Sequence, residues 1–194
     1  MTQLPPINRQ TLIAEARTIV EILERGEYEG PAGPVNIQAD LARLTVGTRQ
    51  YLAEETRALG ALPATQHADR ITRVSVTRET TLAAAQRLLS EQSGPVAVLN
   101  FASATSPGGG FLTGSAAQEE SLARASGLYH SLQQHPEYYA VHQGFGDRLY
   151  SDRLLFSRDV PVFRDAAGHW LDRPWHLDIL TAAAPNLRRL TEVE

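Results

Sequence analysis

The sequence predicts a single α/β domain in which a sheet is flanked by helices. The main observation is the order strand, helix, strand over residues 73–77, 80–89 and 96–101, which is typical of a βαβ unit with a parallel strand pair. The second is size and composition, because 194 residues that are 42% hydrophobic suit one domain with a sizeable core. A net charge of only −4 excludes disorder as the overall state.

The first element is a helix over residues 8–25. Apolar side chains recur there at a spacing of three to four residues from Leu12 to Leu23. Asn8 is a suitable N-cap and Gly26 a suitable stop. The glycine- and proline-rich stretch 29–34 then interrupts regular structure, and residues 41–53 predict a short strand followed by a helix, although this pattern is ambiguous.

The central elements form the expected βαβ unit. Residues 73–77 alternate in polarity and predict a strand, and residues 80–89 carry alanine and leucine at helical spacing. After a turn at Gly94 and Pro95, residues 96–101 form a largely apolar run, which is typical of a strand buried on both faces.

The last third of the chain alternates between helix and strand. A loop of small residues over 102–117 leads into a predicted helix over 118–133, with Leu122, Ala125 and Tyr129 on one face. Three later strands are expected, at residues 154–156, 160–163 and 176–181.

Missing residue types exclude several chemistries. The chain has no cysteine, which rules out disulfides, a thiolate nucleophile and cysteine-ligated metals. All 18 basic residues are arginine, so a Schiff-base lysine and a P-loop lysine are also excluded. The N-terminus lacks the features of a signal peptide and no apolar stretch is long enough to span a bilayer, so we expect a soluble cytoplasmic protein. The slightly acidic balance argues against DNA binding.

Histidine and aromatic residues offer weaker candidates. None of the six histidines stands at a familiar metal-ligand spacing, and no metal site is therefore expected. The pair Tyr138 and Tyr139 could stack a base, but packing of a helix end is the commoner role at this spacing.

Three consecutive glycines, Gly108 to Gly110, follow the apolar strand. Such a run loses much conformational entropy on folding, and it suits a backbone that needs positive φ or close approach to a ligand. Backbone N–H groups in such a loop can bind a phosphate or diphosphate, and a site at the carboxyl end of a parallel strand is where open α/β folds bind ligands. A flexible surface turn is the alternative.

The loop leads directly into Gln118, Glu119 and Glu120. Acidic residues in a first helical turn complement the helix dipole and need no further function. That explanation does not cover the meeting of a strand end, a glycine loop and two carboxylates within about twenty residues, which indicates a binding or catalytic site.

The spacing Gly-Gly-Gly, seven residues, Gln-Glu-Glu resembles the signature of poly(ADP-ribose) glycohydrolases, whose catalytic domain is a macrodomain. The segments 98–105, 121–129, 155–165 and 181–186 are similar to the microbial branch of that family. The resemblance implies a macrodomain-like mixed sheet flanked by helices, and it is strongest from about residue 96 to 186.

The resemblance also implies a catalytic role for the acidic pair. Glu120 would protonate the leaving 2′-oxygen of a ribose–ribose glycosidic bond, and its carboxylate would then activate water. Glu119 would hold ribose hydroxyls, and Gln118 would orient the pair.

Further roles follow from the same resemblance. Gly108, Gly109 and Gly110 would cradle the diphosphate, and Phe111 would carry the loop across it. Asn100 would hydrogen-bond near the distal ribose, although a strand-end cap is an alternative for this residue. No metal and no dissociable cofactor are implied.

The resemblance divides the chain into an N-terminal helical extension, residues 1–70, and a macrodomain-like catalytic region, residues 71–194, which together form one compact unit. Microbial members continue past the motif at 181–186 and carry a second glycine-rich loop. The expectation is therefore that this chain lacks the C-terminal part of the domain.

The expected function is hydrolysis of poly(ADP-ribose) to ADP-ribose by a cytoplasmic bacterial enzyme, with the polymer or ADP-ribose on modified proteins as partner. An ADP-ribose-binding module or inactive remnant is the alternative, because the second loop is absent. A glycosidase acting on mono-ADP-ribosyl adducts is a third reading.

Overall fold

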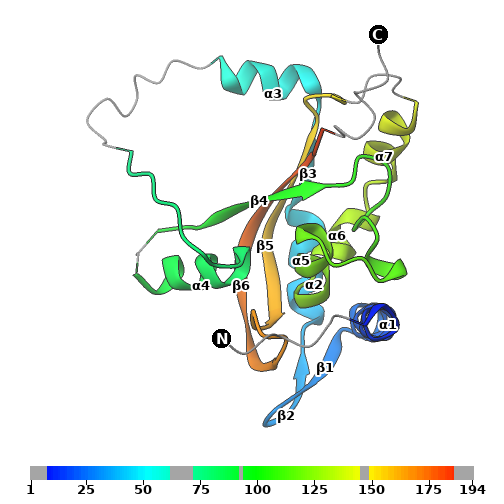
Figure 1. The fold of residues 1–194 in the computed structure, drawn as a ribbon, viewed down its shortest axis with the longest axis vertical. Coiled ribbons are helices and arrows are strands. Elements are labelled where there is room, and N and C mark those ends of the chain that lie inside the picture. The colour runs from blue at the N-terminus through cyan, green and yellow to red at the C-terminus, as the bar shows by residue number, and fades with distance from the viewer. Residues whose placement is uncertain (1–7, 62–71, 92–93, 145–148, 186–194) are drawn as a thin grey trace.

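The fold is built around a four-stranded mixed sheet (Figure 1), and the computed structural model describes residues 8–61, 72–91, 94–144 and 149–185. The sheet has the order β3-β5-β6-β4, with β3 at Thr48–Tyr51, β5 at Leu154–Arg164, β6 at Trp170–Ala183 and β4 at Ala97–Ala102. The pairs β3–β5 and β5–β6 are antiparallel, and β4–β6 is parallel. The strand β4 is therefore an edge strand, and its carboxyl end leads into the glycine loop.

The first helix has the predicted boundaries. It is α1, Arg9–Arg25, and the Asn8 side chain accepts a hydrogen bond from the Gln10 N–H, as a capping residue should. Gly26 ends the helix in the left-handed conformation, with φ of 70°, which glycine adopts without strain. A hairpin of β1, Glu27–Gly30, and β2, Gly33–Asn36, follows.

One face of the sheet is covered by helices. Figure 1 shows α2, Gln38–Gly47, α5, Gln118–Ala125, and α6, Leu128–Gln133, on the same side of the strands. Side chains from these helices and from α1 form one core with the inward residues of β5 and β6, and the most buried include Ile19, Leu44, Leu122, Leu128, Leu155, Leu177 and Ile179.

The remaining helices lie around this core. They are α3, Ala53–Gly60, α4, Thr81–Glu91, and α7, Pro136–Gln143, with one short 3₁₀ turn, η2, at Phe111–Thr113. Figure 1 shows α4 on the side of the sheet opposite α2 and α5. Among the described residues, no helix combines the length and hydrophobicity that crossing a bilayer requires.

Two expected strands are not found where they were predicted. Residues 73–77 form no strand, and Val74 and Val76 are 87% and 97% exposed, because their alternation is not matched by a pairing partner. The parallel pair is instead β4 with β6, whose partners are far apart in sequence. Residues 41–53 hold the end of α2 and then β3, so the predicted order of strand and helix is reversed there.

Two other predictions are changed in detail. The helix expected over 118–133 is divided into α5 and α6 at Ser126, which is extended and forms a bridge with Val162. The strands expected at 154–156 and 160–163 are one strand, β5, whose register shifts between Ser157 and Val160. Tertiary pairing with β5 and β6 decides both features, and the local sequence does not show them.

The strand β4 is buried on one face only, contrary to the expectation of burial on both. Asn100 and Ala102 are buried, whereas Leu99 and Phe101 are 44% and 60% exposed. Successive side chains of a strand point to opposite faces of the sheet, so the face of β4 that carries Leu99 and Phe101 is only partly covered by the described residues.

The N-terminal part of the chain contains more than helices. It also supplies the hairpin β1–β2 and the edge strand β3 of the main sheet. The expected division at residue 70 falls within 62–71, outside the described residues.

Candidate active site

The first turn of α5 carries two buried carboxylates. Glu119 and Glu120 are 3% and 6% exposed, although an ionised carboxylate loses much favourable hydration when it is buried. The positive end of the helix dipole favours acids at this position. Ala117, the capping residue, contributes no side-chain hydrogen bond to the helix start. Other contacts must therefore fix this turn.

Glu119 is held against the start of the loop that follows β4. Its Oε2 accepts a hydrogen bond from the Ser103 N–H at 2.7 Å. Burial raises the pKa of Glu119 from 4.5 to about 7, and the charge of Glu120 adds to the rise. Hydrogen bonds from Ser103, Asn100 and Gly108 oppose the rise without cancelling it. A carboxyl group that titrates near neutral pH can both give and take a proton.

Glu120 is held by the glycine loop. Its Oε1 accepts a hydrogen bond from the Gly110 N–H at 2.8 Å. Its other oxygen, Oε2, is buried and has no hydrogen-bond partner among the described residues. One oxygen is therefore fixed by the backbone, while the second keeps its full capacity to accept or donate a hydrogen bond.

The glycines are needed because the loop passes close to these carboxylates. Gly108 and Gly109 have φ of 68° and 58°, in the left-handed region. A Cβ atom on Gly109 would lie 2.7 Å from Glu120 Oε1 and 2.8 Å from Glu119 Oε2. Gly109 therefore lies between the two acids, and no larger residue fits there without displacing one of them.

The N–H groups of the loop already have partners. The Gly109 N–H donates to Ser106 O at 3.0 Å, and the Gly110 N–H donates to Glu120. The expected nest for a diphosphate is thus occupied by internal hydrogen bonds in this conformation. The expected contact of these glycines with a diphosphate stays a prediction.

Asn100 and Phe111 lie close to the acids but inside the protein. Asn100 is fully buried, and its amide donates to Thr181 Oγ1 at 3.2 Å. Phe111 is also fully buried, with its ring centroid 4.9 Å from that of Tyr129, so it anchors the loop in the core. Both side chains position their neighbours in this conformation, and their expected ligand contacts stay predictions.

Gln118 faces the edge of β4. Its Oε1 accepts from the Phe101 N–H at 2.9 Å, and its Nε2 donates to Leu99 O at 2.7 Å. The three consecutive side chains Gln118 to Glu120 thus bind the strand, the start of the loop and the glycines in turn.

Sequence reasoning missed the groups that support the loop from behind. Arg124 is only 7% exposed and its Nη2 donates to Ser115 O. Arg9, at the start of α1, donates from Nε to Thr113 O at 2.8 Å. The spacing of four residues between Glu120 and Arg124 was the available signal, since it places both on one side of a helix.

Other candidates lie outside this arrangement. Tyr138 and Tyr139 are 0% and 2% exposed, which confirms that they pack in the core. Within the described ranges, no group of three His, Asp or Glu side chains is placed to hold a metal ion. A cavity of about 760 Å³ lies beside Pro95 and Val96, at the opposite end of β4 from the acids.

Comparison with known proteins identifies a family. Residues 16–165 match the family model of the microbial-type PARG catalytic domain, where PARG denotes poly(ADP-ribose) glycohydrolase. Among curated proteins, none gives a significant match.

Solved structures are similar over most of the chain. The poly(ADP-ribose) glycohydrolase of Thermomonospora curvata is 49% identical with a TM-score of 0.89, and the match covers 95% of this chain and 68% of that one. A structure of the enzyme from the same organism bound to the inhibitor ADP-HPD is 48% identical with a TM-score of 0.86, covering 95% and 67%. The Deinococcus radiodurans enzyme in complex with ADP-ribose is 43% identical with a TM-score of 0.72, covering 81% and 62%.

Proposed function

The chain belongs to the microbial-type poly(ADP-ribose) glycohydrolase family, and from that premise we propose that it hydrolyses ribose–ribose O-glycosidic bonds of poly(ADP-ribose) and releases ADP-ribose. The family membership and the macrodomain-like fold predicted from the glycine and glutamate motif are thereby confirmed. ADP-ribose, which the Deinococcus radiodurans enzyme binds, is the ligand class we assign to this site.

The observation that carries the proposal is the geometry of Glu120. The Gly110 N–H fixes one carboxylate oxygen, and the second oxygen is left without a hydrogen-bond partner among the described residues. A proton donor for a glycosidic oxygen needs such a fixed group with one free oxygen. In the proposed reaction, Glu120 protonates the leaving 2′-oxygen as the bond to the anomeric carbon breaks. The resulting carboxylate then takes a proton from the water that attacks this carbon.

Glu119 supports the same chemistry as a neighbour. Because burial raises its pKa to about 7, a large share of molecules carry a proton on Glu119 at neutral pH. A neutral Glu119 limits the repulsion between the two acids and can donate a hydrogen bond to a ribose oxygen. Glu119 also has a buried oxygen, Oε1, without a hydrogen-bond partner among the described residues. The assignment of ribose binding to Glu119 and of proton transfer to Glu120 therefore follows the family resemblance.

The test is release of ADP-ribose from poly(ADP-ribose), measured by mass spectrometry, for the unchanged chain and the Glu120→Gln variant. Loss of one acid–base group is expected to lower turnover by about 10²–10⁴-fold. Binding of ADP-ribose, measured by calorimetry, is expected to change by less than about threefold, because glutamine keeps the acceptor for the Gly110 N–H. Glu24→Gln, at an exposed position of α1, is the matched control.

Two outcomes would count against the proposal. Polymer cleavage that survives in the Glu120→Gln variant would exclude Glu120 as the proton donor. ADP-ribose binding without any release by the unchanged, folded chain would favour a binding module over an enzyme.

A further inference from the structure

The second half of the glycine loop is hydrogen-bonded to α5 at both of its ends. At one end, the Gly110 N–H donates to Glu120. At the other end, Ser115 O accepts from Arg124 Nη2. The two ends are also joined to each other, because the Ser115 N–H donates to Gly110 O at 3.0 Å. A displacement of Ser115 is therefore transmitted to Gly110 and from there to Glu120.

Arg124 supports this segment from inside the protein. Its side chain is buried, and the centre of its guanidinium lies 6.0 Å from the ring centroid of Phe111, the residue after the glycines. Burial lowers the pKa of the Arg124 guanidinium, and the nearby charges of Glu15 and Glu120 oppose this change. A guanidinium without water is stable only where protein groups surround it, so Arg124 is confined to one place behind the loop.

The first turn of α1 supports the same segment from outside. Arg9 Nε donates to Thr113 O at 2.8 Å. The loop also touches the helix directly, because a Cβ atom on Gly114 would lie 2.7 Å from Arg9 O and 3.1 Å from Ile13 Cγ1. The helix is itself fixed, since Ile19 is fully buried in the core. The loop therefore lies between α5 and a well-anchored α1.

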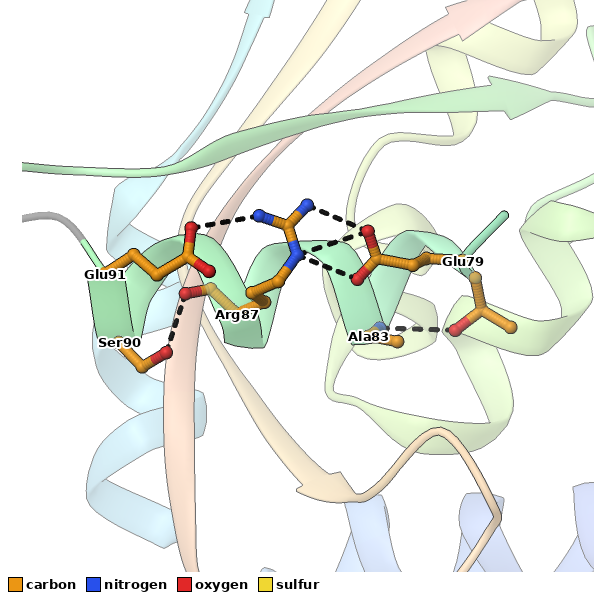
Figure 2. A network of polar contacts seen from close by, with 6 residues as sticks. Glu79, Ala83, Arg87, Ser90 and Glu91 are labelled. Atoms are coloured by element: carbon orange, nitrogen blue, oxygen red, sulfur yellow. Dashed lines mark hydrogen bonds and ion pairs between the residues drawn. The ribbon is translucent and has the colours of Figure 1, made fainter. Parts of the chain in front are cut away.

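Both arginines bind backbone carbonyls of a different element, which is not the usual arrangement of an arginine on a helix. Figure 2 shows the usual one, in which Arg87 of α4 binds Glu79 at 2.8 Å and Glu91 at 3.0 Å. Those partners lie within α4 or directly before it, so they stabilise that helix alone. Arg9, in contrast, binds a residue 104 positions away in the chain, and so it joins two separate elements.

We propose that Arg9 and Arg124 form a clamp on the segment 110–115, and that this clamp positions Glu120 for proton transfer. Both arginines act through backbone carbonyls of the loop, so they are positioning residues and not substrate ligands. The inference rests on the proposed function of Glu120. Arg9 precedes residues 16–165, which match the family model, so its role is argued from the contacts in this chain.

The first test is the Arg9→Met variant, which removes the bond to Thr113 O at an exposed position and should therefore fold normally. A displacement of about 1 Å at reacting groups costs on the order of 10²-fold in rate. Because Arg124 still holds the loop, we expect a smaller displacement, with kcat lowered by about 3- to 10-fold and KM changed by less than about twofold. Arg9→Lys, which keeps a charged donor, should restore about half of the activity.

The second test uses Arg124, whose guanidinium is both a donor to the loop and a charge near Glu120. Arg124→Met removes both features, and Arg124→Lys keeps the charge while it loses the planar fork. We expect Arg124→Met to lower kcat by about 10- to 100-fold and Arg124→Lys by about 3- to 10-fold, with the Kd for ADP-ribose changed by less than about threefold in each. Thermal unfolding of both variants checks that they are folded.

A structural readout separates the clamp from the proposed function. In the Arg9→Met variant the Gly110 amide proton should exchange with solvent at least about threefold faster, by hydrogen-exchange NMR. Two arginine substitutions away from the loop are the matched controls. Arg87→Met removes the contacts of Figure 2, and Arg17→Met lies on the exposed side of α1. Both should leave kcat and the Gly110 exchange rate unchanged.

The outcomes distinguish the two proposals. Faster exchange at Gly110 supports the clamp even if the unchanged chain does not cleave polymer, a result that would contradict only the proposed function. Unchanged exchange at Gly110 together with unchanged kcat in the Arg9→Met and Arg124→Lys variants would overturn the clamp. A variant that raises KM with kcat unchanged would overturn the positioning role and indicate a direct substrate contact.

Discussion

Glu119 makes the free energy of unfolding depend on pH. Its pKa of about 7 lies above the ordinary value of 4.5 because the side chain is buried, so the folded state holds a proton over this range that the unfolded chain releases. The contribution to the free energy of unfolding is therefore complete below about pH 4.5 and is lost as the pH rises to about 7. At about 1.4 kcal/mol per pKa unit, the difference between 4.5 and about 7 corresponds to a loss of about 3–4 kcal/mol.

The variant Glu119→Gln removes this dependence, since glutamine does not titrate. Urea unfolding at pH 5, 6, 7 and 8 should show the variant gaining stability over the unchanged chain as the pH rises. Glu24→Gln serves again as the control, because that side chain is exposed. Parallel stability curves for the Glu119→Gln variant and the unchanged chain would show that Glu119 titrates normally.

Gly109 is the glycine whose replacement should matter most. Alanine there meets both a left-handed backbone, with φ of 58°, and the carboxylate oxygens of Glu119 and Glu120 within 3 Å. We expect Gly109→Ala to lower turnover by on the order of 10²-fold through displaced acids and stability by about 1–3 kcal/mol through backbone strain.

The matched substitution is Gly60→Ala, because a Cβ atom there meets nothing within 4 Å. It should leave polymer hydrolysis unchanged in the same mass-spectrometric assay. Equal activity of the two variants would mean that the loop can move away from the acids without loss of function.

At the scale of the element, the sheet has two unequal faces. Leu177 of β6 is 2% exposed beneath the helices, whereas Leu99 of β4 is 44% exposed. Leu177→Ala should therefore lower the free energy of unfolding by about 2–5 kcal/mol, and Leu99→Ala by less than about 1 kcal/mol. Chemical denaturation of both variants measures the difference, and similar losses would show that the outer face of β4 is covered in solution.

At the scale of the whole molecule, one core joins the N-terminal and C-terminal parts of the chain. Leu44 of α2 and Leu132 of α6 are both fully buried in it. The chain should therefore unfold in a single calorimetric transition. Leu44→Ala and Leu132→Ala should each lower the free energy of unfolding by about 2–5 kcal/mol and move this one transition to lower temperature. Two separate transitions, with only one moved by Leu44→Ala, would instead show independent units.

The sequence by itself determined the features that depend on neighbouring residues. The helix α1 begins after Asn8 and ends at Gly26 because capping and left-handed glycine are local effects. The three glycines before Gln-Glu-Glu likewise predicted the family, since the whole motif lies within one short stretch of the chain.

Only the tertiary structure decided what depends on distant partners. Residues 73–77 have the alternation of a strand but no strand to pair with, and β4 pairs instead with β6, about eighty residues away. The glycines were expected to bind a diphosphate, which stays a prediction. The structure shows that Gly109 makes room for two carboxylates. Strand pairing, and the close approach of a loop to buried side chains, depend on which segments meet in space. The periodicity of one segment does not identify the segment with which it pairs.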